Sequence, residues 1–151
     1  MTQLADDVEI LLVEDNRSDE ELTLHAFRKY NLFNRVQVVR DGAEALDFLF
    51  CRGAFADREK SNNPKVILLD IKLPKVSGLE VLGQLKANRD TKRIPVVMLT
   101  SSQEESDIVA GYRLGANSYI VKPVGFEQLT EAVRDIGMYW LLLNTPPNES
   151  P

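Results

Sequence analysis

Four short apolar segments in this chain each end abruptly in polar side chains, and this pattern limits the possible folds more than any other feature. The segments are 10–13, 66–69, 96–99 and 119–121. Each is too short for a helix and apolar throughout, which is typical of strands buried on both faces of a parallel sheet. Segments with helical periodicity separate them, so the sequence predicts a single α/β domain.

The predicted elements alternate along nearly the whole chain. We expect strands at about 8–14, 35–40, 65–70, 94–100 and 117–121. We expect helices at about 17–30, 42–51, 77–88, 104–114 and 125–143. Ser77 and Ser102 each precede a helix and have a glutamate three residues later, the pattern of a capping box. We therefore expect a flexible N-terminus at 1–7, one folded domain at 8–143 and a disordered tail at 144–151.

Composition and charge narrow the class of protein. The net charge of −5 argues against non-specific binding to nucleic acid or to an anionic membrane. No apolar run approaches the roughly 18 residues of a membrane-spanning helix, and the N-terminus does not resemble a signal peptide. Cys51 is the only cysteine, so no intrachain disulfide can form. These features predict a cytoplasmic protein that binds neither nucleic acid nor membrane.

The residues at the strand ends are candidates for one shared site. Glu14 and Asp15 follow the first apolar segment, and Asp70 follows the second. Thr100 and Lys122 follow the last two. In an open α/β sheet, ligands bind outside the carboxyl ends of the strands, so we expect these five residues to lie close together.

Three neighbouring carboxylates need positive charge to be stable. At about 4 Å and an effective dielectric constant of about 20, each pair costs on the order of 4 kcal/mol. Lys122 supplies one charge and a divalent cation would supply two more; oxygen ligands without His or Cys favour Mg²⁺, with Mn²⁺ as a substitute. Asp70 then has the surroundings of a nucleophile that forms an aspartyl phosphate. Lys122 would neutralise the phosphoryl oxygens, and Thr100 would donate a hydrogen bond to one of them.

These residues stand in motifs of a known family. The chain resembles, over about 8–140, the CheY-like receiver domains of two-component response regulators. The motifs are Leu12-Val13-Glu14-Asp15, Leu68-Leu69-Asp70-Ile71-Lys72-Leu73-Pro74, Ser77-Gly78, Pro95-Val96-Val97-Met98-Leu99-Thr100, Gly115-Ala116 and Lys122-Pro123. The resemblance implies a doubly wound (βα)5, flavodoxin-like fold with a five-stranded parallel sheet in the order 2-1-3-4-5 and helices on both faces.

The resemblance also implies a phosphoacceptor role. Asp70 would accept a phosphoryl group from the phosphohistidine of a histidine kinase. Glu14, Asp15 and Asp70, with the backbone carbonyl of Lys72, would hold the Mg²⁺. The protein would be no enzyme in the usual sense, because it would catalyse only its own phosphorylation and dephosphorylation and would signal by changing conformation.

Other motif residues would connect the site to that change. Thr100 and Lys122 would contact the phosphoryl group, and Tyr119 would be an aromatic switch that turns inward as Thr100 moves. The Lys122–Pro123 bond would be a cis peptide, which proline makes accessible at about 0.5–1 kcal/mol.

A narrower resemblance concerns the periphery of the domain. A long polar link at 52–65, the Arg93-Ile-Pro-Val-Val phrase and an extended last helix bearing Trp140 are similar to the cyanobacterial phytochrome-partnered response regulators. Those proteins are stand-alone receivers that work as dimers. The resemblance implies that a phytochrome is the partner kinase.

The end of the last predicted helix is apolar nearly all round. A predicted core stripe recurs at steps of three and four residues: Phe126, Leu129, Val133, Ile136, Trp140 and Leu143. Tyr139, Leu141 and Leu142 are additional and, with Trp140, predict a homodimer through the fourth helix, fifth strand and fifth helix. Alternatively, the link at 52–65 folds over these side chains within the protomer.

Other interpretations remain open from the residues alone. The first helix carries a candidate kinase-docking face of Asp19, Glu20, Leu22, Thr23 and Phe27. A metal-dependent phosphatase would place a second acid two residues after the nucleophile, where this chain has Lys72. A flavodoxin-like cofactor site would put two acids in the loop that should cradle a phosphate. A receiver that acts only as a scaffold would have lost active-site residues that this chain retains.

Overall fold

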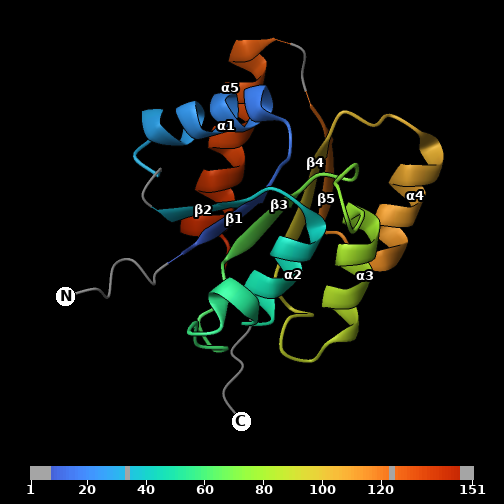
Figure 1. Ribbon diagram of the computed structural model, residues 1–151. Helices are drawn as coiled ribbons and strands as arrows, with labels where there is room; N and C mark the ends of the chain where they lie inside the picture. The colour runs from blue at the N-terminus through green and yellow to red at the C-terminus, as the bar shows by residue number, and fades with distance from the viewer. Residues whose placement is uncertain (1–7, 33–34, 123–124, 147–151) are drawn as a thin grey trace.

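Five parallel strands form one sheet in the order β2-β1-β3-β4-β5. The computed structural model describes residues 8–32, 35–122 and 125–146 (Figure 1). The strands are β1 (Ile10–Val13), β2 (Val36–Val39), β3 (Val66–Leu69), β4 (Val96–Thr100) and β5 (Ser118–Val121). The helices are α1 (Arg17–Lys29), α2 (Gly42–Leu49), η3 (Gly53–Phe55), α3 (Gly78–Ala87), α4 (Glu105–Leu114), α5 (Phe126–Gly137) and η4 (Met138–Leu143). The predicted fold class and strand order are confirmed.

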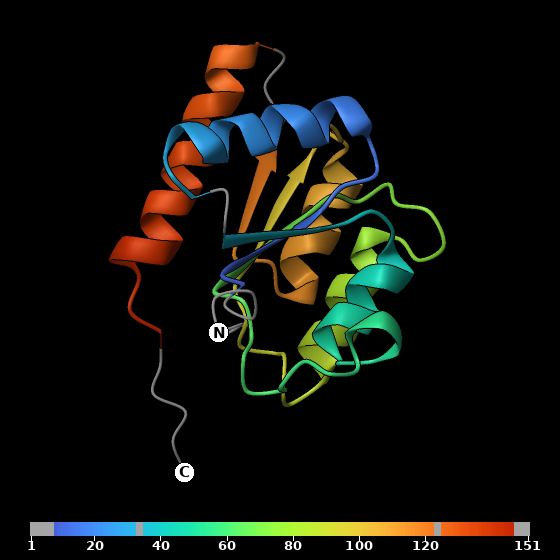
Figure 2. The ribbon, with the colours of Figure 1, turned by 60° about the vertical axis from the view of Figure 1, so that its left-hand side comes forward.

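Helices cover both faces of the sheet. Helices α1 and α5 lie on one face, and α2, α3 and α4 lie on the other (Figures 1 and 2). Alternate residues of the central strands serve the two cores: Leu11 and Val13 pack toward α2 and α3, whereas Ile10 and Leu12 pack toward α1 and α5. Burial on both faces explains why these strands are apolar at every position. In the described part of the chain, no helix is long and apolar enough to cross a membrane.

Side-chain caps mark three helix starts. Asn16, Asp41 and Ser77 each accept a hydrogen bond from the backbone N–H three residues on, at 2.9, 2.7 and 3.2 Å. These bonds satisfy N–H groups that have no partner inside the helix. The capping box predicted at Ser102 is wrong: α4 begins at Glu105 after Glu104, and no side chain caps it.

The polar link at 52–65 is anchored on α2. The guanidinium of Arg58 lies 4.1 Å from the centroid of the Phe48 ring and donates hydrogen bonds to the backbone oxygens of Phe48 and Asn62. The ring of Phe55 meets the ring of Phe48 edge to face, at 5.0 Å between centroids. These contacts hold most of the link away from the last helix; only its last residues, 63–65, border a pocket together with Trp140.

The last helix ends in a π-helical turn, and this changes which side chains face the core. Leu129, Val133 and Ile136 are buried as predicted, but Leu141 follows them into the core, with Trp140 packed only partly against it. A π turn joins residues five apart, so the fifth residue after Ile136 replaces the fourth. The predicted stripe is therefore wrong at both of its ends, where Phe126 and Leu143 are exposed.

The predicted terminal segments are only partly described. The N-terminal segment 1–7 and the end of the predicted tail, 147–151, lie outside the described residues. Residues 144–146 have no regular secondary structure, although the Asn144 N–H donates to the backbone oxygen of Tyr139 at 2.7 Å. The proposed boundary at 143 remains a prediction.

Candidate functional site

The carboxyl ends of the central strands bring the predicted polar residues to one edge of the sheet. Asp70 comes directly after β3 and is buried, with its Oδ1 accepting a 2.7 Å hydrogen bond from the Ile71 N–H. Glu14 comes directly after the neighbouring β1 and is also buried. Asp15 follows it and is exposed. Parallel pairing of β1 with β3 sets Val13 opposite Leu69, so the acids that follow these residues meet.

Lys122 reaches into the same cluster from the end of β5. Its ammonium lies 2.7 Å from Glu14 Oε1, 2.8 Å from Asp19 Oδ2 and 3.1 Å from Asp70 Oδ2. The Lys122 side chain is 8% exposed. A buried charge is tolerated only when it is paired, and here one cation offsets part of the charge of several acids.

Burial and charge shift the pKa values of this cluster. Burial raises the pKa of Glu14 from 4.5 to about 7, against the hydrogen bond from Lys122, while the charge of Asp70 raises it further. Burial disfavours the charge on Lys122, but hydrogen bonds to Asp19 and Glu14 and attraction to Asp70 outweigh it and raise the pKa of Lys122. Between pH 4.5 and about 7 the folded protein keeps a Glu14 proton that the unfolded chain releases, so this group lowers stability as pH rises.

Three of the carboxylates are close enough together to hold one metal ion. One oxygen each from Glu14, Asp15 and Asp70 lies within 4.8 Å of the other two. The ligand set contains only oxygen, which fits Mg²⁺ or Mn²⁺ better than zinc. The exposed position of Asp15 leaves an open side through which a hydrated ion could enter.

Ser102 connects the hydroxyl at the end of β4 to the neighbouring elements. The Thr100 hydroxyl oxygen accepts a 3.3 Å hydrogen bond from the Ser102 N–H. The Ser102 carbonyl accepts one from the Tyr119 hydroxyl at 3.0 Å, and the Ser102 hydroxyl donates to Asp107 at 2.6 Å. Burial raises the pKa of the Tyr119 hydroxyl. The two predicted switch residues are thus linked through the segment that leads into α4.

Comparison with known proteins places this arrangement in a family. Residues 10–134 match the family described as the response regulator receiver domain. The chain belongs to this family. The receiver is 41% identical over 138 residues to Response regulator Rcp1 of Synechocystis, covering 91% of this chain and 92% of Rcp1. It is also 41% identical over 138 residues to a probable methanogenesis regulatory protein, FilR2 of Methanothrix harundinacea, covering 91% and 86% of the two chains.

Solved structures of related proteins agree with the fold. The phosphorylated cyanobacterial phytochrome response regulator RcpA has a TM-score of 0.84 at 41% identity, covering 92% of this chain and 97% of RcpA. The Mn²⁺-bound form of Rcp1 has a TM-score of 0.83 at 39% identity, with coverage of 92% and 98%. The bacteriophytochrome response regulator RtBRR is 58% identical, with a TM-score of 0.73 and coverage of 93% and 84%. The predicted resemblance to phytochrome response regulators is confirmed.

One residue of the carboxylate cluster of this receiver, Asp19, was not predicted as part of it. Asp19 was expected on a kinase-docking face, but its carboxylate binds Lys122. It lies 103 positions before Lys122, and no local pattern in the sequence indicates this ion pair. The docking face itself is largely wrong, because Thr23 and Phe27 are buried.

The rest of that face is also occupied within the receiver. Glu20 is buried and accepts two hydrogen bonds from the Arg40 guanidinium, at 2.9 and 2.8 Å. Leu22 is partly buried against the core beneath α1. The surface that α1 presents to solvent instead includes Glu21 and His25.

Two further predictions concern backbone groups. Lys72 has an exposed side chain two residues after Asp70, and its backbone carbonyl remains a predicted metal ligand. The predicted cis peptide between Lys122 and Pro123 involves a residue outside the described part of the chain, so it also remains a prediction.

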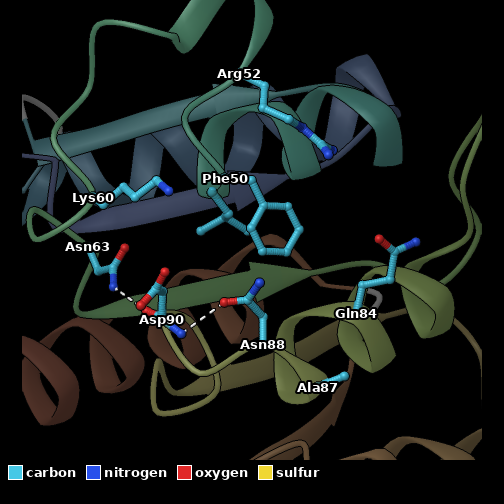
Figure 3. Close-up of a pocket in the computed structure, with 9 residues that line it drawn as sticks. Phe50, Arg52, Lys60, Asn63, Gln84, Ala87, Asn88 and Asp90 are labelled. Carbon is cyan, nitrogen blue, oxygen red and sulfur yellow. Dashed lines mark hydrogen bonds between the residues drawn. The ribbon is translucent and has the colours of Figure 1, made fainter.

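A pocket lies at the amino ends of the strands, opposite the carboxylate cluster. It has a volume of about 480 Å³ and lies between the ends of α2 and α3 and the link before β3. Figure 3 shows Phe50 pointing into it, with Arg52 and Lys60 on one side and Asn88 and Gln84 on the other. None of the predicted site residues lines it, so it is separate from the carboxylate cluster.

Proposed function

We propose that this receiver accepts a phosphoryl group on Asp70 from a histidine kinase, with Mg²⁺ bound by Glu14, Asp15, Asp70 and the backbone carbonyl of Lys72. The observation that carries the proposal is the contact of 3.1 Å between buried Asp70 and Lys122, beside two further carboxylates. A carboxylate with a fixed cation at hydrogen-bonding distance is suited to receive a group that carries negative charge. Mn²⁺ is an acceptable substitute, as the Mn²⁺-bound form of Rcp1 supports.

The reaction uses Asp70 as the nucleophile. An Asp70 oxygen forms a bond to phosphorus while the bond from phosphorus to the kinase histidine nitrogen breaks, and the imidazole leaves with that electron pair. When bound, Mg²⁺ would neutralise part of the charge on the transferred oxygens. Lys122 would contribute a second positive charge, and the Thr100 hydroxyl would donate to one of these oxygens.

The same contacts provide a route from phosphorylation to a change of surface. The Thr100 hydroxyl oxygen accepts a hydrogen bond from the Ser102 N–H, so movement of Thr100 toward a phosphoryl oxygen would draw Ser102 with it. Ser102 in turn accepts from Tyr119, so the ring of Tyr119 and the start of α4 would respond together. Phosphorylation would then change the populations of two conformations by its different interaction with each.

The test of this function is labelling by a small phosphoryl donor. The protein is incubated with Mg²⁺ and either acetyl phosphate or phosphoramidate, and its intact mass is measured. We expect a gain of one phosphoryl group that disappears when EDTA removes the metal. No gain with either donor would contradict Asp70 as a freely accessible acceptor.

The raised pKa of Glu14 predicts that Mg²⁺ binds more tightly as pH rises. With a pKa of about 7, Glu14 holds a proton in roughly nine-tenths of the molecules at pH 6 and in about one-tenth at pH 8. Metal ligands must lose their protons, so the affinity should rise about tenfold over this interval. Isothermal titration calorimetry would measure it, with Glu14→Gln as the control that should bind weakly and show little pH dependence. An equal affinity at both pH values in the wild type would contradict the prediction.

The partner kinase is proposed to be a phytochrome. The identity of 58% to the bacteriophytochrome response regulator RtBRR supports this choice. Transfer of labelled phosphate from an autophosphorylated bacteriophytochrome kinase to this receiver would test it. A kinase of another sensory class should transfer more slowly at equal concentration.

We also propose a homodimer through α4, β5 and α5, including the π-helix η4 that continues α5. Tyr139, Leu142 and Leu143 are exposed there, at 49%, 62% and 70%. The link at 52–65 is anchored on α2 and does not cover them. Leu141 belongs to the protomer's own core, so the proposed interface narrows to Tyr139, Trp140 and Leu142 of the four residues expected.

Leu142→Glu is expected to weaken the dimer about tenfold or more, because a carboxylate would be buried in an apolar interface. Sedimentation velocity over a range of concentrations would measure the change. Ser61→Glu adds the same charge on the exposed link and should leave the dissociation constant unchanged. An unaltered sedimentation profile for Leu142→Glu would exclude this surface.

A further inference from the structure

The three N–H donors of Lys122 are fully occupied. They meet Glu14 at 2.7 Å, Asp19 at 2.8 Å and Asp70 at 3.1 Å. A lysine ammonium has three donors and no more. Any additional acceptor, including a phosphoryl oxygen, must therefore displace one of these three carboxylates.

Asp19 differs from the other two partners. It lies in the first turn of α1, whereas Glu14 and Asp70 come directly after strands. Its side chain is 32% exposed, compared with 2% for Glu14 and 9% for Asp70. Among the described residues, it also lies outside the group of acids whose oxygens are close enough together to share a metal ion.

We propose that Asp19 is a positioning residue that holds Lys122 at the edge of the carboxylate cluster when Glu14 and Asp70 bind Mg²⁺. The inference rests on the proposed function, because it concerns how the same site accommodates a metal ion and a phosphoryl group. An ammonium and a divalent cation repel each other when they share ligands. Asp19 lets Lys122 leave the metal ligands without becoming an unpaired buried charge, which would be strongly unfavourable.

This role has two opposite consequences. By providing another partner for Lys122, Asp19 reduces the competition between the lysine and Mg²⁺ for Glu14 and Asp70. The same carboxylate then competes with the phosphoryl oxygens for the Lys122 donors. Asp19 should therefore favour binding of the metal ion and slow the transfer that follows.

The test uses Asp19→Asn, which keeps the shape of the side chain and the backbone N–H that Asn16 caps. The dissociation constant of Mg²⁺ is measured by calorimetry, and the rate of mass gain from phosphoramidate is measured at saturating Mg²⁺. We expect Mg²⁺ to bind about fivefold more weakly and labelling to be about threefold faster, changes typical of a partly exposed ion pair. Glu21→Gln removes one charge from an exposed position of the same helix and should change neither quantity.

A second comparison shows whether Asp19 acts through the lysine. In a Lys122→Met background, Asp19→Asn should weaken Mg²⁺ binding no more than Glu21→Gln does, because there is no ammonium left to position. A persistent fivefold loss would mean that Asp19 acts by its own charge, and would overturn the proposal. Circular dichroism would verify that the Lys122→Met protein is folded.

The outcomes separate this inference from the proposed function. If the wild type is not labelled while it binds Mg²⁺ normally, the proposed function fails. If the wild type is labelled, Asp19→Asn must both bind Mg²⁺ more weakly and be labelled faster. Any other pair of results for these two quantities overturns the role of Asp19. A parallel loss of binding and labelling would indicate simple structural damage.

Discussion

Asp70→Asn is expected to abolish labelling by phosphoramidate while leaving the fold intact. An amide is a far weaker nucleophile than a carboxylate and cannot form the acyl phosphate. Its oxygen can still accept the hydrogen bond from the Ile71 N–H that holds Asp70 at 2.7 Å. Lys122 keeps contacts with Glu14 and Asp19, so no charge is left buried without a partner. Removing one of several close acids should leave the melting temperature equal to or above that of the wild type.

The matched control for this substitution is Asp47→Asn. Asp47 is an acid on α2 that contacts Arg52 at 3.5 Å and has no part in the carboxylate cluster. This variant should gain a phosphoryl group at the wild-type rate when both are followed by intact mass. Continued labelling of Asp70→Asn would instead identify another acceptor and would remove the central residue from the proposed mechanism.

The second large effect is expected at Gly78, the first residue of α3. A Cβ at this position would overlap the backbone oxygen of Asp70 and would lie 2.8 Å from the Ile71 Cα. The Gly78 N–H also donates to the Ile71 carbonyl at 2.8 Å, so the two segments cannot separate without losing that bond. Gly78→Ala should therefore lower the free energy of unfolding by about 3 kcal/mol and displace Asp70.

Gly83→Ala provides the control in the same helix. A Cβ there would meet only the Leu114 side chain, at an ordinary 3.7 Å. Alanine is a better helix former than glycine, so this variant should be more stable by about 0.5–1 kcal/mol. Urea denaturation would measure both variants, and labelling would show the displacement of Asp70. Equal stabilities would contradict the close packing of α3 against the residues after β3.

The strand-end residues could be predicted because the signal is local. Each apolar segment ends at its strand's last residue or one residue before it, so Asp70 and Thr100 could be located from the sequence alone. The parallel arrangement then follows from the helices between the strands, and it brings the ends together. The sequence therefore predicted that Asp70 and Lys122 lie close together, and the structure places them 3.1 Å apart.

The features that could not be predicted depend on contacts between distant segments. Asp19 and Lys122 are 103 positions apart, and nothing near either residue indicates their ion pair. Arg58 holds its link against Phe48 through side-chain geometry that composition does not encode. The burial of Phe27 was missed because several apolar positions of α1 could have faced the core.

The prediction of which side chains of the last helix face the core was wrong for a different reason. Helical periodicity assumes a constant turn, and the π-helical segment at Met138–Leu143 breaks that assumption. Leu141 therefore took the core position expected for Trp140. A pattern search with a fixed period cannot detect such a shift, because the sequence remains apolar at every nearby position.

Two peripheral features of this chain lie at the opposite end of the sheet from its carboxylate cluster. The link at 52–65 borders the pocket that includes Asn88. The π-helix η4 borders a second pocket, which includes Pro95 just before β4. Both lie at the amino ends of the strands, whereas Asp70 lies at the carboxyl ends. Substitutions among the residues that line these two pockets therefore replace no residue of the carboxylate cluster. Descendants of this protein could acquire new binding surfaces there while inheriting the same carboxylate cluster.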